Sequence, residues 1–323
     1  MRAPALRRWA RPLIGAALLT ALAWWYPLES ITDAFASLDG PTITAALTIG
    51  LATTVLCAAR WVLVARGVGL RLPWGRAVGD YYRAVLLNAV LPSGILGDVH
   101  RALGHGRYAG DLPRGVRAVI LERAAGQVVL AAAGATLLFT LPAALLGPGL
   151  FTVAASLALP ALVGAVMCLR RVPALTATIA DVRAGLFTTG TGPGVLLLSV
   201  AALAGHVTLF LVAAHAAGVT APALSLLPLA IAALLAMSVP ANIGGWGPRE
   251  AVTALTFGAA GLGSATGLTV SVLYGLLALV AALPGVLVLL WRLLPVERVQ
   301  VPGEGPGQER QQVTPLVRRG ARR

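Results

Sequence analysis

Residues 194–217, GVLLLSVAALAGHVTLFLVAAHAA, decide the fold class, because this stretch contains no Asp, Glu, Lys or Arg. A helix needs roughly 20 apolar residues to cross the hydrocarbon core of a bilayer. Comparable apolar segments occur near residues 12–28, 42–65, 116–141, 149–169, 223–239 and 266–291. The sequence therefore predicts an all-α polytopic membrane protein.

The composition of the whole chain agrees with this fold class. Of its 323 residues, 58% are hydrophobic and 11% are charged, whereas about 25% of the residues of a soluble domain are charged. This composition excludes a water-soluble globule and a disordered chain. The net charge of +13 indicates cytoplasmic loops and anionic lipid headgroups rather than a nucleic-acid partner.

Two further apolar stretches, 81–97 and 241–263, are interrupted by Pro, Gly and charged residues, which predicts a broken or re-entrant helix at each. The loop 29–41 contains acidic residues and no Arg, so we expect it outside. The Arg-rich stretches 66–76 and 98–117 are expected inside. With both termini inside, the number of crossings is even. We expect eight crossings, including 241–263, and one re-entrant segment.

The chain divides into a membrane domain, residues 1–294, and a tail, residues 295–323. The tail is rich in Pro, Gly, Gln and Arg, which predicts a disordered basic segment in the cytoplasm. The expected location is the plasma membrane, with multiple passes and both termini cytoplasmic.

The two interrupted stretches share the pattern P-x-x-I-x-G-x-x-x-R. Its fixed positions are Pro92, Ile95, Gly97 and Arg101 in the first copy and Pro240, Ile243, Gly245 and Arg249 in the second. Pro removes a helix donor and Gly frees the backbone, and Gly244 and Gly247 extend this freedom in the second copy. Paired broken helices are typical of a transporter site near the bilayer middle. The pattern predicts an internal repeat, inverted or parallel.

Charged side chains within these segments are the candidate binding residues, because a charge at a helix centre in lipid costs about 2.5–3.5 kcal/mol. Arg101 and Arg249 are expected to bind an anionic headgroup, since a guanidinium binds phosphate in two places. Asp98 and Glu250 either orient these arginines or meet a cationic part of the ligand. The other candidates are Glu122, Arg123, Asn242 and Trp246.

Each of these roles has a structural alternative. Glu122 and Arg123 are adjacent opposite charges that would also suit a helix end at the membrane interface, and Trp246 would also suit an interfacial anchor. Arg249 would also suit an ion pair that latches the two halves together. The sequence contains no P-loop, nucleotide fingerprint or nucleophile elbow, and no spacing typical of metal ligands. We expect no catalytic residues, no metal and no cofactor, and we expect His206 and His215 to hydrogen-bond between helices.

Residues 88–101, 121–123 and 239–250 resemble the hallmarks of the lysylphosphatidylglycerol synthase transmembrane-region family, whose members are also called flippase-like domain proteins. The resemblance covers about residues 10–295 and departs at residues 95–97, Ile-Leu-Gly, where Gly-Gly would be expected. In full-length bacterial synthases this region is the lipid-translocating half, and a soluble half performs aminoacyl transfer. The resemblance implies a stand-alone membrane module without the aminoacyltransferase domain.

The leading interpretation is a flippase for an anionic, aminoacylated or polyprenyl-phosphate-linked lipid. The alternative is a non-transporting membrane partner of a glycosyltransferase or lipid-modifying enzyme. A third interpretation, an intramembrane enzyme, rests only on the carboxylates of Asp98, Glu122 and Glu250.

Overall fold

The computed structural model describes most of the chain as helices. The described residues are 28–91, 94–140, 181, 183–186, 188, 190–238 and 247–291. Every regular element among them is an α-helix, which confirms the all-α class. The predicted crossings near 12–28 and 149–169 and the predicted tail 295–323 lie outside the described residues.

Long apolar helices form the frame of the bundle. They are α3 (Gly40–Gly67), α6 (Leu112–Thr140), α9 (Gly192–Ala216) and α12 (Ser264–Ala282), the last followed by α13 (Pro284–Trp291). Within the described residues, four segments are long and apolar enough to cross a membrane: Gly40–Gly67, Leu112–Leu137, Gly192–Ala216 and Ser264–Leu290. They correspond to the crossings predicted at 42–65, 116–141, 194–217 and 266–291. The total of eight crossings stays a prediction.

Shorter helices lie between these long ones. They are α2 (Leu28–Ala36), α4 (Trp74–Val90), α5 (Leu96–Ala109), α10 (Ala223–Met237) and α11 (Pro248–Ala259). The segment predicted to cross at 223–239 is α10, which has 15 residues and carries Pro228 within it. A helix of that length spans less than the hydrocarbon core. The order long, short, short, long occurs twice, as α3 to α6 and as α9 to α12.

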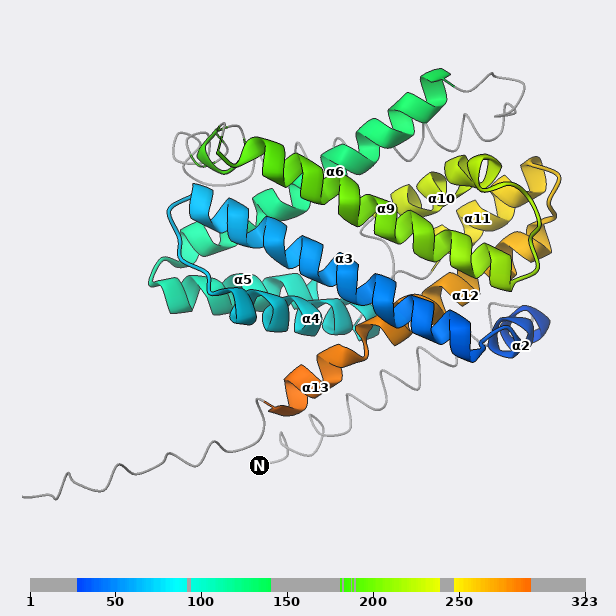
Figure 1. The fold of residues 1–323 in the computed structure, drawn as a ribbon, viewed down its shortest axis with the longest axis horizontal. Helices are drawn as coiled ribbons and strands as arrows, with labels where there is room; N and C mark the ends of the chain where they lie inside the picture. Colours follow the sequence, from blue (N-terminus) through cyan, green and yellow to red (C-terminus); the bar gives the residue numbers. More distant parts are fainter. Residues whose placement is uncertain are drawn as a thin grey trace, which may run out of the picture.

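The two series meet along α3 and α9, which run antiparallel and side by side (Figure 1). Glycines allow their backbones to approach closely. A Cβ atom added at Gly205 would overlap the side chain of Thr53, and one added at Gly194 would lie 2.9 Å from Leu63 Cδ1. Small residues are the usual means by which helices pack closely in a membrane.

The first interrupted stretch is a hairpin of α4 and α5 with its break at residues 91–95. Gly94 has φ +62° and supplies the left-handed turn. Gly97, predicted as part of the break, lies instead in the first turn of α5 and packs against the backbone of Ala84, where an added Cβ would overlap the carbonyl oxygen. Its N–H donates to Asn88 Oδ1 at 2.7 Å. Gly97 therefore serves the contact between the two helices.

In the second interrupted stretch, α10 ends at Met237 and α11 begins at Pro248, directly after Gly247 with φ +108°. The other predicted break residues, Pro92, Pro240, Gly244 and Gly245, lie outside the described residues.

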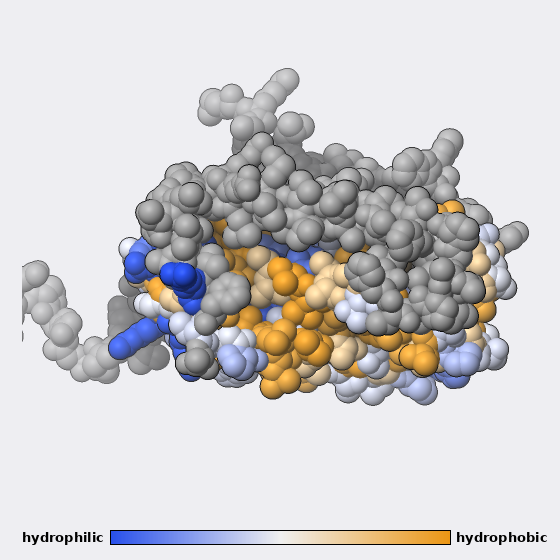
Figure 2. Space-filling view, turned by 90° about the horizontal axis from the view of Figure 1, so that it is seen from above, coloured by the Kyte–Doolittle hydropathy of each residue, from blue (hydrophilic) through white to orange (hydrophobic). Residues whose placement is uncertain are grey.

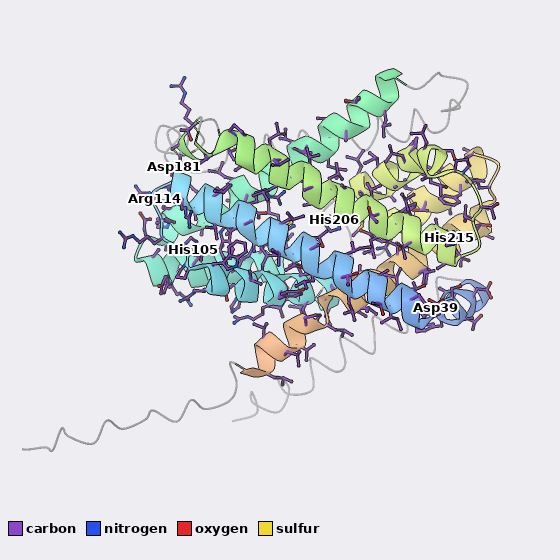
Figure 3. The ribbon with its side chains drawn as sticks, in the orientation of Figure 1. Asp39, His105, Arg114, Asp181, His206 and His215 are labelled. Atoms are coloured by element: carbon purple, nitrogen blue, oxygen red, sulfur yellow. The ribbon has the colours of Figure 1, made fainter. Side chains whose placement is uncertain are left out.

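The two ends of the bundle differ in charge. One end holds the connections from α3 to α4 and from α5 to α6, with Arg66, Arg71, Arg76, Arg107 and Arg114. At the other end, the connections from α2 to α3, from α9 to α10 and from α11 to α12 contain Asp39 and no Arg. Figure 3 places Arg114 at the first end and Asp39 at the second. Hydrophobic residues gather between the ends on the face seen in Figure 2, as suits a membrane-spanning bundle.

Candidate functional site

A cavity of about 380 Å³ lies between the two series of helices. This volume is within the range of small-molecule sites, about 300–1,000 Å³. Its wall is formed mainly by α3, α4, α6, α9, α10 and α12. The polar and charged residues of the wall include Arg60, Asn88, Arg123, Gln127, Ser199, His206, Ser238 and Arg249. Among the described residues that line it there is no Asp or Glu, so its wall is cationic.

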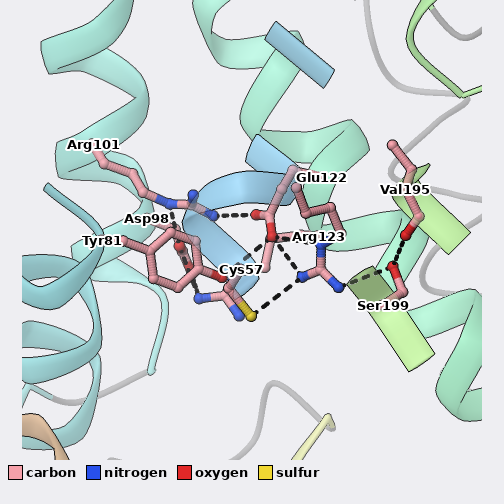
Figure 4. Close-up of polar contacts among 9 residues, drawn as sticks. Cys57, Tyr81, Asp98, Arg101, Glu122, Arg123, Val195 and Ser199 are labelled. Atoms are coloured by element: carbon pink, nitrogen blue, oxygen red, sulfur yellow. Dashed lines mark hydrogen bonds and ion pairs between the residues drawn. The ribbon is translucent and has the colours of Figure 1, made fainter. Parts of the chain in front are cut away.

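Glu122 is the centre of a buried charged network beside the cavity (Figure 4). Its Oε1 atom accepts hydrogen bonds from Arg60, through Nη2 at 2.5 Å and Nε at 3.0 Å, and from Tyr81 Oη at 3.2 Å. Its Oε2 atom accepts from Arg101 Nη2 at 2.5 Å. A buried carboxylate is tolerated only when it is paired and hydrogen-bonded in this way. Glu122 thus joins α3, α4 and α5 to α6.

Asp98 forms ion pairs with both Arg101 and Arg123. It accepts from Arg101 Nε at 2.8 Å, from Arg123 Nη2 at 2.7 Å and from Asn88 Nδ2 at 3.0 Å. The guanidinium of Arg101 also lies over the rings of Tyr81 and Trp61, with centroid distances of 4.4 and 4.8 Å. Such cation–π contacts add to the attraction of the carboxylates.

The structure therefore locates Arg101 differently from the sequence expectation. Its side chain is 0% exposed, enclosed by two carboxylates and two aromatic rings, and it is not part of the cavity wall. The neighbouring Arg123 does line the cavity, and 41% of its side chain is exposed. The physical reason is that the carboxylates of α5 and α6 draw the Arg101 guanidinium into the packed interior. Glu122 and Arg123 likewise lie within the bundle and not at a helix end.

Arg60 is a wall residue that the sequence reasoning did not single out. It extends from α3, about two turns before the end of that helix, to Glu122 and donates through Nη1 to Ser199 Oγ on α9 at 3.1 Å. Arg60 and Arg66 are the only charged residues of α3, and Arg66 lies in its last turn. A single Arg in the interior of an otherwise uncharged crossing is the pattern that would have identified it, because such a charge needs a partner or a function.

The second interrupted stretch has its own charged network. Arg249 forms an ion pair with Glu250, and its Nε donates to Ser271 Oγ on α12 at 3.0 Å. Glu250 Oε2 accepts the N–H of Gly247 at 2.5 Å, which fixes the start of α11. Arg249 lies 5.2 Å from the Tyr274 ring centroid and lines the cavity. The predicted contacts Asn242 and Trp246 lie outside the described residues.

Arg101 and Arg249 occupy corresponding positions in the two series. Each lies near the start of the second short helix, and each donates to a polar side chain on the long helix that follows, Glu122 on α6 or Ser271 on α12. The two networks therefore lie at related places around one cavity.

The comparison with known families is specific. The model of one family, described as the lysylphosphatidylglycerol synthase TM region, matches residues 10–285. This match includes both charged networks and every residue of the cavity wall. A search of curated proteins and a search of solved structures each gave no significant match.

Proposed function

The chain belongs to the lysylphosphatidylglycerol synthase TM region family, and from this membership we propose that it moves a lipid with an anionic headgroup between the leaflets of the membrane. Membership of this family identifies the chain as a multi-pass membrane module linked to lipid modification or translocation. The headgroup is proposed to pass through the central cavity.

The cationic wall of the cavity is the observation that carries this proposal. Arg60, Arg123 and Arg249 come from three different helices and line one space, with no described carboxylate on its surface. An arginine binds a phosphate or carboxylate through paired N–H donors. An anion in the cavity would neutralise charges that are otherwise expensive to keep inside a membrane protein.

The candidate residues then divide into two roles. Arg123, Arg60 and Arg249 bind the headgroup directly. Glu122 holds Arg60 in place and Asp98 holds Arg123, while Arg101 bridges these two carboxylates. Glu250 holds Arg249 in place. The contribution of Asn242 and Trp246 to the headgroup site stays a prediction.

We propose that the two series of helices are an internal repeat. The shared order of long and short helices, the related positions of Arg101 and Arg249, and the antiparallel course of α3 and α9 support an inverted repeat. In transporters built in this way, substrate sites lie between the repeats near the bilayer midplane. The Arg-rich end is proposed to face the cytoplasm of a plasma-membrane protein.

Translocation can be measured with the full chain purified and reconstituted into vesicles. The probes are phosphatidylglycerol and phosphatidic acid, each with a fluorescent label on an acyl chain, and a membrane-impermeant reductant bleaches the label in the outer leaflet only. If the proposal is right, the protein exposes the inner-leaflet label to the reductant. Vesicles in which the inner-leaflet label stays protected would favour the alternative, a non-transporting partner of another enzyme.

Variants connect this activity to the cavity. Arg123→Gln should slow translocation because it removes the most exposed cationic group, and Arg249→Lys should slow it because Lys keeps the charge but loses the paired donors. Arg249→Ala should slow it further. The matched control is Arg114→Gln, since Arg114 lies at the end of the bundle in a half-exposed ion pair with Asp111. Wild-type rates in Arg123→Gln and Arg249→Ala would exclude the cavity as the headgroup site.

A further inference from the structure

Resting on the proposed function, we infer that the headgroup is a phosphomonoester, and that His206 on α9 together with Arg60 and Arg123 selects it over phosphodiester and aminoacylated headgroups. This assigns to His206 a role in recognition that goes beyond general attraction of an anion.

The charged residues around the cavity do not balance. The two networks contain the cationic residues Arg60, Arg101, Arg123 and Arg249 and the acidic residues Asp98, Glu122 and Glu250. The four arginines and three carboxylates of these two networks leave one positive charge in excess. Residues 92–93, 141–180 and 239–246 contain no Asp or Glu in their sequence, so these segments supply no countercharge.

This excess disfavours the cationic headgroup of an aminoacylated lipid. An ammonium group in the cavity would meet three arginines on the wall and no described carboxylate. Like charges in an environment of low dielectric constant repel strongly. The inference therefore separates this chain from the lipid named in the description of its family.

Phosphomonoester and phosphodiester headgroups differ in negative charge and in the number of free oxygens. A phosphomonoester carries about 1.5–2 negative charges at neutral pH and three free oxygens that accept strong hydrogen bonds. A phosphodiester keeps one charge. Arg123 can donate to such an oxygen, because its guanidinium lines the cavity and 41% of its side chain is exposed. Arg60 is held beside it by Glu122.

His206 lies on the cavity wall formed by α9. Its imidazole lines the cavity and is open to it, in the same wall as Arg60 and Arg123. No hydrogen bond of His206 to another described residue is found, in contrast to the interhelical hydrogen bond expected from the sequence. A neutral imidazole offers one N–H donor, and a protonated one offers two donors and a charge. His206 can therefore donate a hydrogen bond to the additional oxygen of a phosphomonoester.

A pair of lipids that differ by one methyl group tests this inference. Phosphatidic acid is a phosphomonoester, and phosphatidylmethanol with the same acyl chains is its phosphodiester. Binding of each to the purified full chain in detergent is measured by displacement of a fluorescent phosphatidic acid. We expect phosphatidic acid to bind about tenfold more tightly, or by about 1.4 kcal/mol, because its additional oxygen accepts one more charge-assisted hydrogen bond. Lysylphosphatidylglycerol should compete more weakly than phosphatidylmethanol.

His206→Leu removes the imidazole donor and should reduce the preference for phosphatidic acid over phosphatidylmethanol to less than about twofold. His215→Leu is the matched control, because His215 lies on the same helix at its far end and not in the cavity wall (Figure 3). Its preference should equal that of the wild type. The wild-type comparison of the two lipids does not depend on any variant.

The possible results separate this inference from the proposed function. Equal affinities of the wild type for phosphatidic acid and phosphatidylmethanol would overturn the inference and leave anionic lipid translocation standing. Failure to bind any anionic lipid would overturn both. Displacement by inorganic phosphate at the concentrations at which phosphatidic acid acts would overturn the assignment to a lipid. A preference that survives in His206→Leu would overturn the role of His206.

Discussion

At the scale of single residues, Glu122 determines how the charges of the interior are arranged. One carboxylate accepts hydrogen bonds from Arg60 on α3 and Arg101 on α5, and Tyr81 of α4 donates to the same oxygen as Arg60. Glu122 thereby positions a cationic group on the cavity wall and holds a short helix against the bundle.

Replacement of this carboxylate tests its structural role. Glu122→Gln should lower the free energy of unfolding by about 3–5 kcal/mol, because it leaves buried guanidinium groups without their countercharge. The measurement is thermal unfolding of the purified protein in detergent. Asp111→Asn is the control, since the partly exposed ion pair of Asp111 with Arg114 is worth about 0–1 kcal/mol. Equal unfolding temperatures for the two variants would contradict the role given to Glu122.

Sequence reasoning identified most of the charged residues of the site but not all of their partners. Glu122, Arg123 and Arg249 were candidates because charge within an apolar segment is conspicuous. That Arg101 is enclosed behind the wall, and that Arg60 forms part of it, depends on how distant helices pack together. Hydropathy along one segment contains no information on that packing.

At the scale of elements, hydropathy predicted the long helices well. The crossings expected at 42–65 and 194–217 are α3, Gly40–Gly67, and α9, Gly192–Ala216. The span near 266–291 was predicted as one helix but divides at Leu283, between α12 and α13. The role of Gly97 was not predictable either, because its reason is the backbone of a neighbouring helix and not its own conformation.

The same substitution at two glycines of α5 tests this packing. Gly97→Ala should destabilise the protein by about 1–3 kcal/mol, because the added Cβ overlaps the Ala84 carbonyl oxygen and a backbone atom cannot easily shift. Gly104→Ala has no atom within 4 Å of its Cβ and should be neutral or stabilising, since Ala favours a helix. Thermal unfolding and the monodisperse fraction in size-exclusion chromatography measure both. Equal behaviour of the two variants would contradict the close contact of α4 and α5.

At the scale of the whole molecule, the uneven distribution of charge specifies an orientation. Arginines cluster at the end that holds the connections from α3 to α4 and from α5 to α6, and described connections at the opposite end lack them. Loops rich in Arg stay on the cytoplasmic side. The end with Asp39, which caps α3 by accepting the N–H of Thr42 at 2.8 Å, is therefore expected outside.

Cysteine labelling in intact cells measures this orientation. An impermeant maleimide added outside should label Asp39→Cys and should label Arg114→Cys only after the cells are permeabilised. The parent chain serves as the background for its natural cysteines, of which Cys57 is buried. Labelling of Arg114→Cys in intact cells would reverse the orientation proposed for the bundle.

The close contact of α3 and α9 has a consequence for the route of the lipid tails. Both helices line the cavity, yet an added carbon at Gly205 would already overlap Thr53, and one at Gly194 would reach Leu63. No acyl chain fits through such a seam. Under the proposed function, a lipid whose headgroup lies in the cavity would have to extend its tails past another pair of helices, and its way into the bilayer would lie away from the contact of α3 and α9.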